Sequence, residues 1–103
     1  MDIKMLSDRA LEVRAKYSEL EKERYGREWT RAEIMQGFVG DVGDLMKLVM
    51  AKEGIRTKDN VDEEIKHELA DCFWCVLVLA DKYGVSIEES FLETMDKLEK
   101  RIS

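Results

Sequence analysis

Residues 72–80 read CFWCVLVLA, which is the longest unbroken apolar run in the chain. A helix that is apolar on every side must be surrounded by protein, and the helices of one small chain offer little material to surround it. The run therefore predicts a homodimer or homotetramer with this helix at the interface. A membrane span needs about 20 apolar residues, so a run of nine predicts no membrane partner.

Capping signals on either side of this run divide the chain into four helices. Thr30, Asn60 and Ser86 each precede a glutamate by three residues, which is the spacing of a capping box. The first helix is expected to begin after Ser7, and glycines at positions 26, 54 and 84 are expected to end the first three helices. A polar loop is expected at 55–60.

The composition supports a helical fold. The chain has no proline and only six glycines, which are too few turn residues for an all-β protein. Its 103 residues fit one domain. We therefore expect an all-α, antiparallel four-helix bundle in which residues 1–103 form a single domain and the assembled protein is oligomeric.

The charge balance narrows the possible partners. The chain carries 23 acidic and 17 basic residues, which gives a net charge of −6. General nucleic-acid binding needs a basic face, so no nucleic-acid partner is expected, whereas an acidic protein can concentrate cations. Two cysteines do not make a disulfide framework, and no signal peptide is visible, so we expect a cytoplasmic protein.

Two pairs of acidic residues share their helix faces with apolar residues. Asp41 and Asp44 are three residues apart, as are Glu68 and Asp71, so each pair occupies neighbouring positions on one face. The apolar neighbours predict that these carboxylates point toward the core, where burial is costly without a cation or protons. Oxygen ligands suit a hard cation such as Mg²⁺ or Mn²⁺. Acids at the edge of an ordinary core are the alternative.

Other acidic residues are expected to be solvated. Glu19, Glu21 and Glu23 lie in the most charged of the expected helices and are interpreted as part of a water-facing surface. The second expected helix contains three glycines, at positions 37, 40 and 43, each of which costs a helix up to about 1 kcal/mol relative to alanine. Close helix packing and room for a ligand beside the backbone explain them equally well.

Two further patterns suggest other chemistry. Glu64 and His67 form a Glu-x-x-His pattern, the ligand pattern of di-iron carboxylate bundles, so such a bundle is a rival hypothesis. Cys72 and Cys75 have the spacing of a redox motif. Because they lie inside an apolar helix, their thiols are not expected to be activated.

At the acidic pairs the sequence resembles the MazG-like all-α nucleoside triphosphate pyrophosphohydrolases, a group similar to the dimeric dUTPases and dCTP pyrophosphatases. The first motif reads Gly40-Asp41-Val42-Gly43-Asp44-Leu45, and the second reads Glu68-Leu69-Ala70-Asp71-Cys72-Phe73-Trp74. The resemblance covers about residues 29–103. The two motifs at this separation and in this order make it specific.

The resemblance implies Mg²⁺-dependent cleavage of a nucleoside triphosphate to the monophosphate and pyrophosphate, a reaction suited to cleaning the nucleotide pool. The metal-binding and catalytic residues that it implies are Asp41, Asp44, Glu68 and Asp71. Phosphate contacts are expected from the last helix, at Lys97, Lys100 and Arg101. Trp29 is interpreted as a hydrophobic staple at the start of the second helix, with stacking on a nucleobase as the alternative.

One departure from the family pattern leaves a second function open. Both acids of the first motif are aspartates, one methylene shorter than the glutamates that are usual in the family. The shorter side chains put metal number and reaction rate in question. The alternative is a non-catalytic helical module that senses nucleotides or binds a protein.

Overall fold

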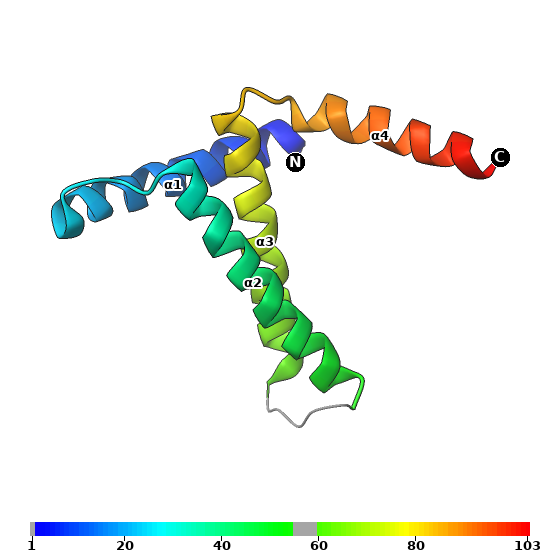
Figure 1. Cartoon of the computed structure of the whole chain (residues 1–103), viewed down its shortest axis with the longest axis horizontal. Helices are drawn as coiled ribbons and strands as arrows, with labels where there is room; N and C mark the ends of the chain where they lie inside the picture. Colours follow the sequence, from blue (N-terminus) through cyan, green and yellow to red (C-terminus); the bar gives the residue numbers. More distant parts are fainter. Residues whose placement is uncertain (1, 55–59) are drawn as a thin grey trace.

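The computed structural model describes residues 2–54 and 60–103, and within these ranges its regular structure is entirely helical (Figure 1). The helices are, in chain order, α1 (Ile3–Tyr25), α2 (Arg31–Lys52), α3 (Val61–Lys82) and α4 (Ile87–Ile102). The all-α class and the four helices are therefore confirmed. The expected polar loop at 55–60 lies outside the described residues, apart from Asn60.

Capping side chains fix where α2 and α4 begin. Thr30 and Glu33 form the complete capping box of α2, and the Ser86 side chain accepts a hydrogen bond from the backbone N–H of Glu89. Asn60 also stands directly before a helix, but its backbone is left-handed, with φ 56°, and its side chain makes no capping hydrogen bond. Two of the three expected side-chain caps therefore form.

The first helix is longer than expected. It begins at Ile3 rather than after Ser7, because the Asp2 carboxylate accepts a hydrogen bond from the backbone N–H of Met5 at 2.9 Å. An aspartate in this position satisfies one of the free N–H groups at a helix start. The other end is as expected, since Gly26 adopts the left-handed conformation and bonds back to the helix.

The body of the molecule is the antiparallel pair of α2 and α3, which lie side by side (Figure 1). α1 crosses α3, and the Trp74 indole N–H donates to the Ala10 carbonyl oxygen at 3.0 Å where they meet. The core of the described chain is small. Its buried apolar side chains are Ala10, Ile34, Leu48, Leu77 and Val78. None of the described helices has the length and apolar character that crossing a membrane requires.

α4 extends away from the other helices in Figure 1 and makes no extensive contact with them in the described chain. The radius of gyration is 16.4 Å, whereas a compact domain of this length has a radius of about 13 Å. The apolar run of α3 is also only partly covered, since Val78 is 1% exposed but Phe73 is 43% exposed. A single chain therefore leaves many apolar side chains exposed to solvent.

The three glycines of α2 have different surroundings. A Cβ atom on Gly37 would lie 3.2 Å from the Trp29 ring, so close packing explains that glycine. A Cβ atom on Gly40 or Gly43 would meet no atom of the described chain within 4 Å. Packing within one chain therefore does not explain Gly40 and Gly43.

We expect Gly40→Ala to raise the free energy of unfolding by up to about 1 kcal/mol, because alanine costs a helix interior less conformational entropy. Gly37→Ala is the matched control and should gain nothing, because its new Cβ displaces Trp29. Urea unfolding of both variants measures this difference. A loss of stability in Gly40→Ala would mean that another chain packs against this position.

Candidate functional site

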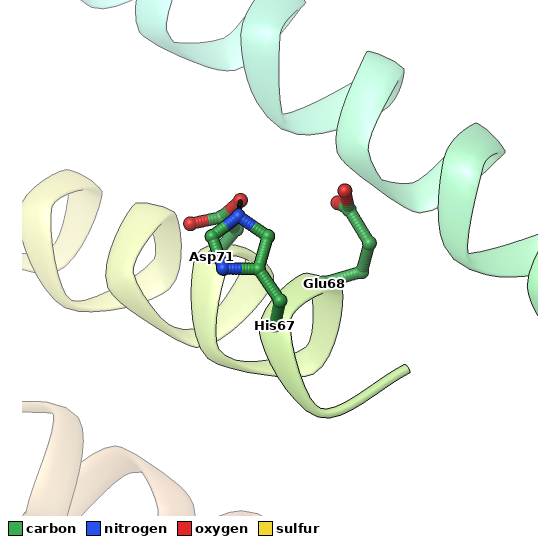
Figure 2. A group of neighbouring side chains, drawn as sticks. All are labelled: His67, Glu68 and Asp71. Atoms are coloured by element: carbon green, nitrogen blue, oxygen red, sulfur yellow. Dashed lines mark ion pairs between the residues drawn. The ribbon is translucent and has the colours of Figure 1, made fainter. Parts of the chain in front are cut away.

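The antiparallel pairing of α2 and α3 brings the two acidic pairs together. Asp41, Asp44 and Glu68 offer carboxylate oxygens that all lie within 4.8 Å of one another. A ring nitrogen of His67 and carboxylate oxygens of Glu68 and Asp71 form a second group within the same distance. Glu68 belongs to both sets, so it links the acids of α2 to those of α3. In Figure 2 its carboxylate points from α3 toward α2.

Burial differs among the four acids. Asp41, Glu68 and Asp71 are half-buried, whereas Asp44 is exposed. Three of the acids thus face inward, as their apolar neighbours predict, and Asp44 lies at the solvent edge of the cluster. Such a cluster has one closed side and one side from which an ion or a phosphate can approach.

Glu68 carries the clearest sign of an unmet interaction. Its Oε2 is buried without a hydrogen-bond partner in the described chain. Burial, and then the nearby charges of Asp41, Asp71 and Asp44, raise the pKa of Glu68. A buried carboxylate oxygen without a partner is costly, so this position needs either a proton or a cation.

Asp41 has a related environment. Burial raises the pKa of Asp41, and the charge of Asp71 adds to the effect. The Cys75 thiol donates to Asp41 Oδ2 with an Sγ–Oδ2 distance of 3.7 Å. Burial, together with the charge of Asp41, raises the pKa of Cys75 to about 11, so this cysteine remains a thiol and is not an activated nucleophile.

The donor set fits a hard divalent cation. Carboxylate oxygens are the ligands that Mg²⁺ and Mn²⁺ favour, and one positive ion would satisfy Glu68 Oε2 and relieve the repulsion among the acids. Asp41, Asp44 and Glu68 form an oxygen-only set, and Asp71 lies beside them. These acidic residues can therefore bind a metal.

His67 lies at the margin of this cluster. Its Nε2 is 3.1 Å from Asp71 Oδ2 (Figure 2), and its side chain is largely exposed. Among the described residues, the possible ligand sets join His67 to Glu68 and Asp71 and do not include Glu64. The Glu-x-x-His pattern of the di-iron hypothesis is therefore not brought together as one ligand set in the described chain.

A cavity of about 410 Å³ opens beside the acid cluster. Asp41 and Asp71 lie on its wall together with Trp29 and Trp74. The Tyr17 and Trp74 rings are 5.7 Å apart between their centroids and tilted by 51°, and Tyr17 also lines the cavity. The arrangement places flat apolar faces next to the carboxylates.

The same wall contains two charged residues of α1 that the sequence interpretation missed. Arg14 and Glu21 form a buried ion pair, with side chains 10% and 9% exposed. The expectation that Glu21 is solvated is therefore wrong. Glu21 Oε1 also accepts from the Trp29 backbone N–H at 2.8 Å. Opposite charges seven residues apart, two turns along one helix face, were the available signal.

The remaining predicted residues divide into two groups. Trp29 lines the cavity with Ile34, so its position suits both the staple and the stacking interpretation. Lys97, Lys100 and Arg101 are exposed on α4. In a single chain α4 points away from the acid cluster (Figure 1), and these three residues do not line the cavity beside it.

The chain is thus an all-α protein in which two facing acid pairs lie beside a cavity with aromatic rings in its wall. The MazG nucleotide pyrophosphohydrolase domain matches residues 30–103. The chain therefore belongs to the MazG nucleotide pyrophosphohydrolase family. A search of curated proteins and a search of solved structures each found no match. The matched residues include both acid pairs but leave α1 outside.

The acid cluster should destabilise the metal-free protein at neutral pH. The pKa of Glu68 is raised above its ordinary value of 4.5, so its contribution to stability is present below that pH and is lost as the pH rises through the folded-state pKa. We expect Glu68→Gln to be more stable than the wild type in metal-free buffer at about pH 7, and the difference to shrink near about pH 4.

Urea unfolding at the two pH values measures this difference. Glu63→Gln is the matched control, because Glu63 is an exposed acid of α3 that pairs with Lys66 at 3.0 Å. A Glu68→Gln variant that is equally destabilised at both pH values would contradict the assignment of unrelieved charge to Glu68.

Proposed function

We propose that the protein is a nucleoside triphosphate pyrophosphohydrolase that depends on Mg²⁺, with Mn²⁺ as a substitute, and that it yields the monophosphate and pyrophosphate. The observation that carries the proposal is the buried, unpartnered Oε2 of Glu68 among the carboxylates of α2 and α3. Family membership supports the reaction class. The proposed role is removal of unwanted nucleotides from a cytoplasmic pool.

The proposed roles follow from position. Asp41, Asp44, Glu68 and Asp71 would hold the cation, which supplies positive charge to the phosphate oxygens when bound. His67 fixes the orientation of Asp71 through their 3.1 Å contact. The aromatic cavity takes the nucleoside, so the triphosphate lies along the carboxylates. Hydrolysis breaks one P–O bond of the bridge between the α- and β-phosphates. The oxygen of a water molecule bonds to the phosphorus of that bond, and the bridging oxygen leaves on the other product.

We also propose that the working protein is at least a homodimer. One chain exposes 7990 Å² of surface, about 2,000 Å² more than the roughly 6,000 Å² expected for a folded monomer of 12.0 kDa. A standard interface buries about 800 Å² per partner. The excess is therefore large enough for an extensive interface.

α4 provides the most obvious part of that interface. Four of its exposed apolar side chains recur at helical spacing and form one stripe, with Leu92 on its flank: Phe91, Met95, Leu98 and Ile102. By the helix periodicity, Lys100 lies opposite this stripe, and Lys97 and Arg101 lie along one flank of the helix. For these three to contact the phosphates, as proposed, α4 of a second copy must lie across the acid cluster.

We expect Glu68→Gln and Asp71→Ala each to lower the turnover rate at least about a hundredfold, because each removes a negative charge that would hold the cation. Glu63→Gln should keep the wild-type rate. The measurement is a panel of ribo- and deoxynucleoside triphosphates with Mg²⁺, with products separated by ion exchange and folding checked by circular dichroism.

Monophosphate with pyrophosphate supports the proposal. Diphosphate with phosphate would contradict it, because the other anhydride bond is then broken. Binding of nucleotide without turnover in both Mg²⁺ and Mn²⁺ would favour the alternative function, a helical module that senses nucleotides.

We expect Leu98→Asp to weaken self-association, because it places a charge in the apolar stripe of α4. Light scattering should give at least about 24 kDa for the wild type, twice the 12.0 kDa of one chain, and a lower mass for the variant. Glu93→Lys changes the charge on the opposite side of α4 and should leave the mass unchanged. A wild-type mass of one chain would contradict the proposal.

A further inference from the structure

The buried pair of Arg14 and Glu21 has no place in the function described so far. It lies in the wall of a cavity that also has the Tyr17, Trp29 and Trp74 rings in its lining. Burying an ion pair contributes little to stability compared with an apolar pair of similar size. The pair also belongs to α1, outside the residues that match the family. These features suggest a ligand that the pair binds.

Both residues of the pair have hydrogen-bonding groups that are not used within the described chain. Glu21 Oε1 is occupied by the Trp29 backbone N–H and by Arg14, whereas no hydrogen bond involves Oε2 among the described residues. Arg14 has five N–H donors, and in the described chain its hydrogen bonding is limited to Glu21. Glu68 Oε2 is the fully buried side-chain atom without a partner in that part of the chain. Both Arg14 and Glu21 line the cavity, and neither has a fully buried side-chain polar atom without a partner in the described chain.

The unused groups are several N–H donors of Arg14 beside one acceptor, Oε2 of Glu21. A matching ligand presents two adjacent acceptors followed by a donor on one edge. Cytosine has this edge, with O2, N3 and the N4 amino group in sequence. Uracil presents an acceptor, a donor and an acceptor, which places its O4 against the Glu21 carboxylate. The pair thus distinguishes an amino group from a carbonyl oxygen on the same ring.

We propose that Arg14 and Glu21 are specificity-determining residues that bind the edge of the nucleobase and favour cytosine over uracil. The proposal rests on the proposed function, because it assumes that the cavity holds the nucleoside of the substrate. The neighbouring Trp29, Tyr17 and Trp74 rings supply flat faces for the base. The Trp74 indole N–H is already donated to Ala10, so Trp74 contributes packing rather than base selection.

The test compares kcat/KM for CTP with UTP and for dCTP with dUTP, in the wild type and in Glu21→Gln. We expect the wild type to have a kcat/KM for cytosine nucleotides that is about tenfold higher or more. With uracil a hydrogen bond to a buried charged group is lost, and such a loss weakens binding by about this factor. In Glu21→Gln the amide keeps an oxygen for Trp29 and can turn its NH₂ toward O4. The cytosine preference should therefore fall toward unity, chiefly through KM.

Glu19→Gln is the matched control, because Glu19 is an exposed acid of α1 that pairs with Lys22. It should keep the wild-type preference. If Glu21→Gln does not fold, Arg14→Lys is tested in its place. Lysine keeps the positive charge but lacks the planar set of N–H donors of arginine, so the preference for cytosine should again fall.

Binding of CMP and UMP to the metal-free protein, by calorimetry, separates this proposal from catalysis. A preference for CMP that Glu21→Gln removes supports the proposal even if no triphosphate is hydrolysed. Equal binding of CMP and UMP by the wild type would overturn it. An equal loss for both ligands in Glu21→Gln would also overturn it, because the pair would then serve the fold alone.

Discussion

The contact between α2 and α3 holds apolar side chains and carboxylates in the same interface, and this juxtaposition governs the rest of the structure. Leu48 and Val78 are almost fully buried and hold the helices together. The same contact holds Asp41 and Glu68 close to one another in a half-buried position, where both carboxyl pKa values rise. Packing thus keeps in place a charge arrangement that repels itself, which a protein retains when a bound cation relieves it.

α1 extends this pair into a larger site. The family match covers residues 30–103, which contain the acids, whereas the cavity beside them needs Arg14, Tyr17 and Glu21 from α1. The carboxylates therefore come from α2 and α3 alone, whereas the cavity beside them also needs α1. We propose that α2 and α3 carry the phosphate chemistry and that α1 contributes the choice of the base.

The sequence predicted the parts of the site that have a periodic signal. The starts of α2 and α4 followed from Thr30 and Ser86, and the ends of the first three helices followed from the terminal glycines, whereas the start of α1 at Ile3 was not predicted. The two acid pairs stood out because apolar residues share their faces. The burial of Glu21 was not predicted, because it lies in a stretch rich in charged residues and its partner Arg14 is two helical turns away. The projection of α4 away from the cluster was also not foreseen. The pattern of an amphipathic helix indicates that its apolar face packs against other helices, but it does not indicate whether those helices belong to the same chain or to another copy.

The most direct test of the central claim, that the acid cluster is a divalent-cation site, is a Mn²⁺ titration followed by electron paramagnetic resonance. Wild type, Glu68→Gln and the control Glu63→Gln would be compared in the same buffer. The account predicts that wild type and Glu63→Gln remove Mn²⁺ from solution with the same affinity, and that Glu68→Gln binds it about tenfold more weakly or worse, a loss of about 1.4 kcal/mol. Equal Mn²⁺ binding by all three proteins would contradict it.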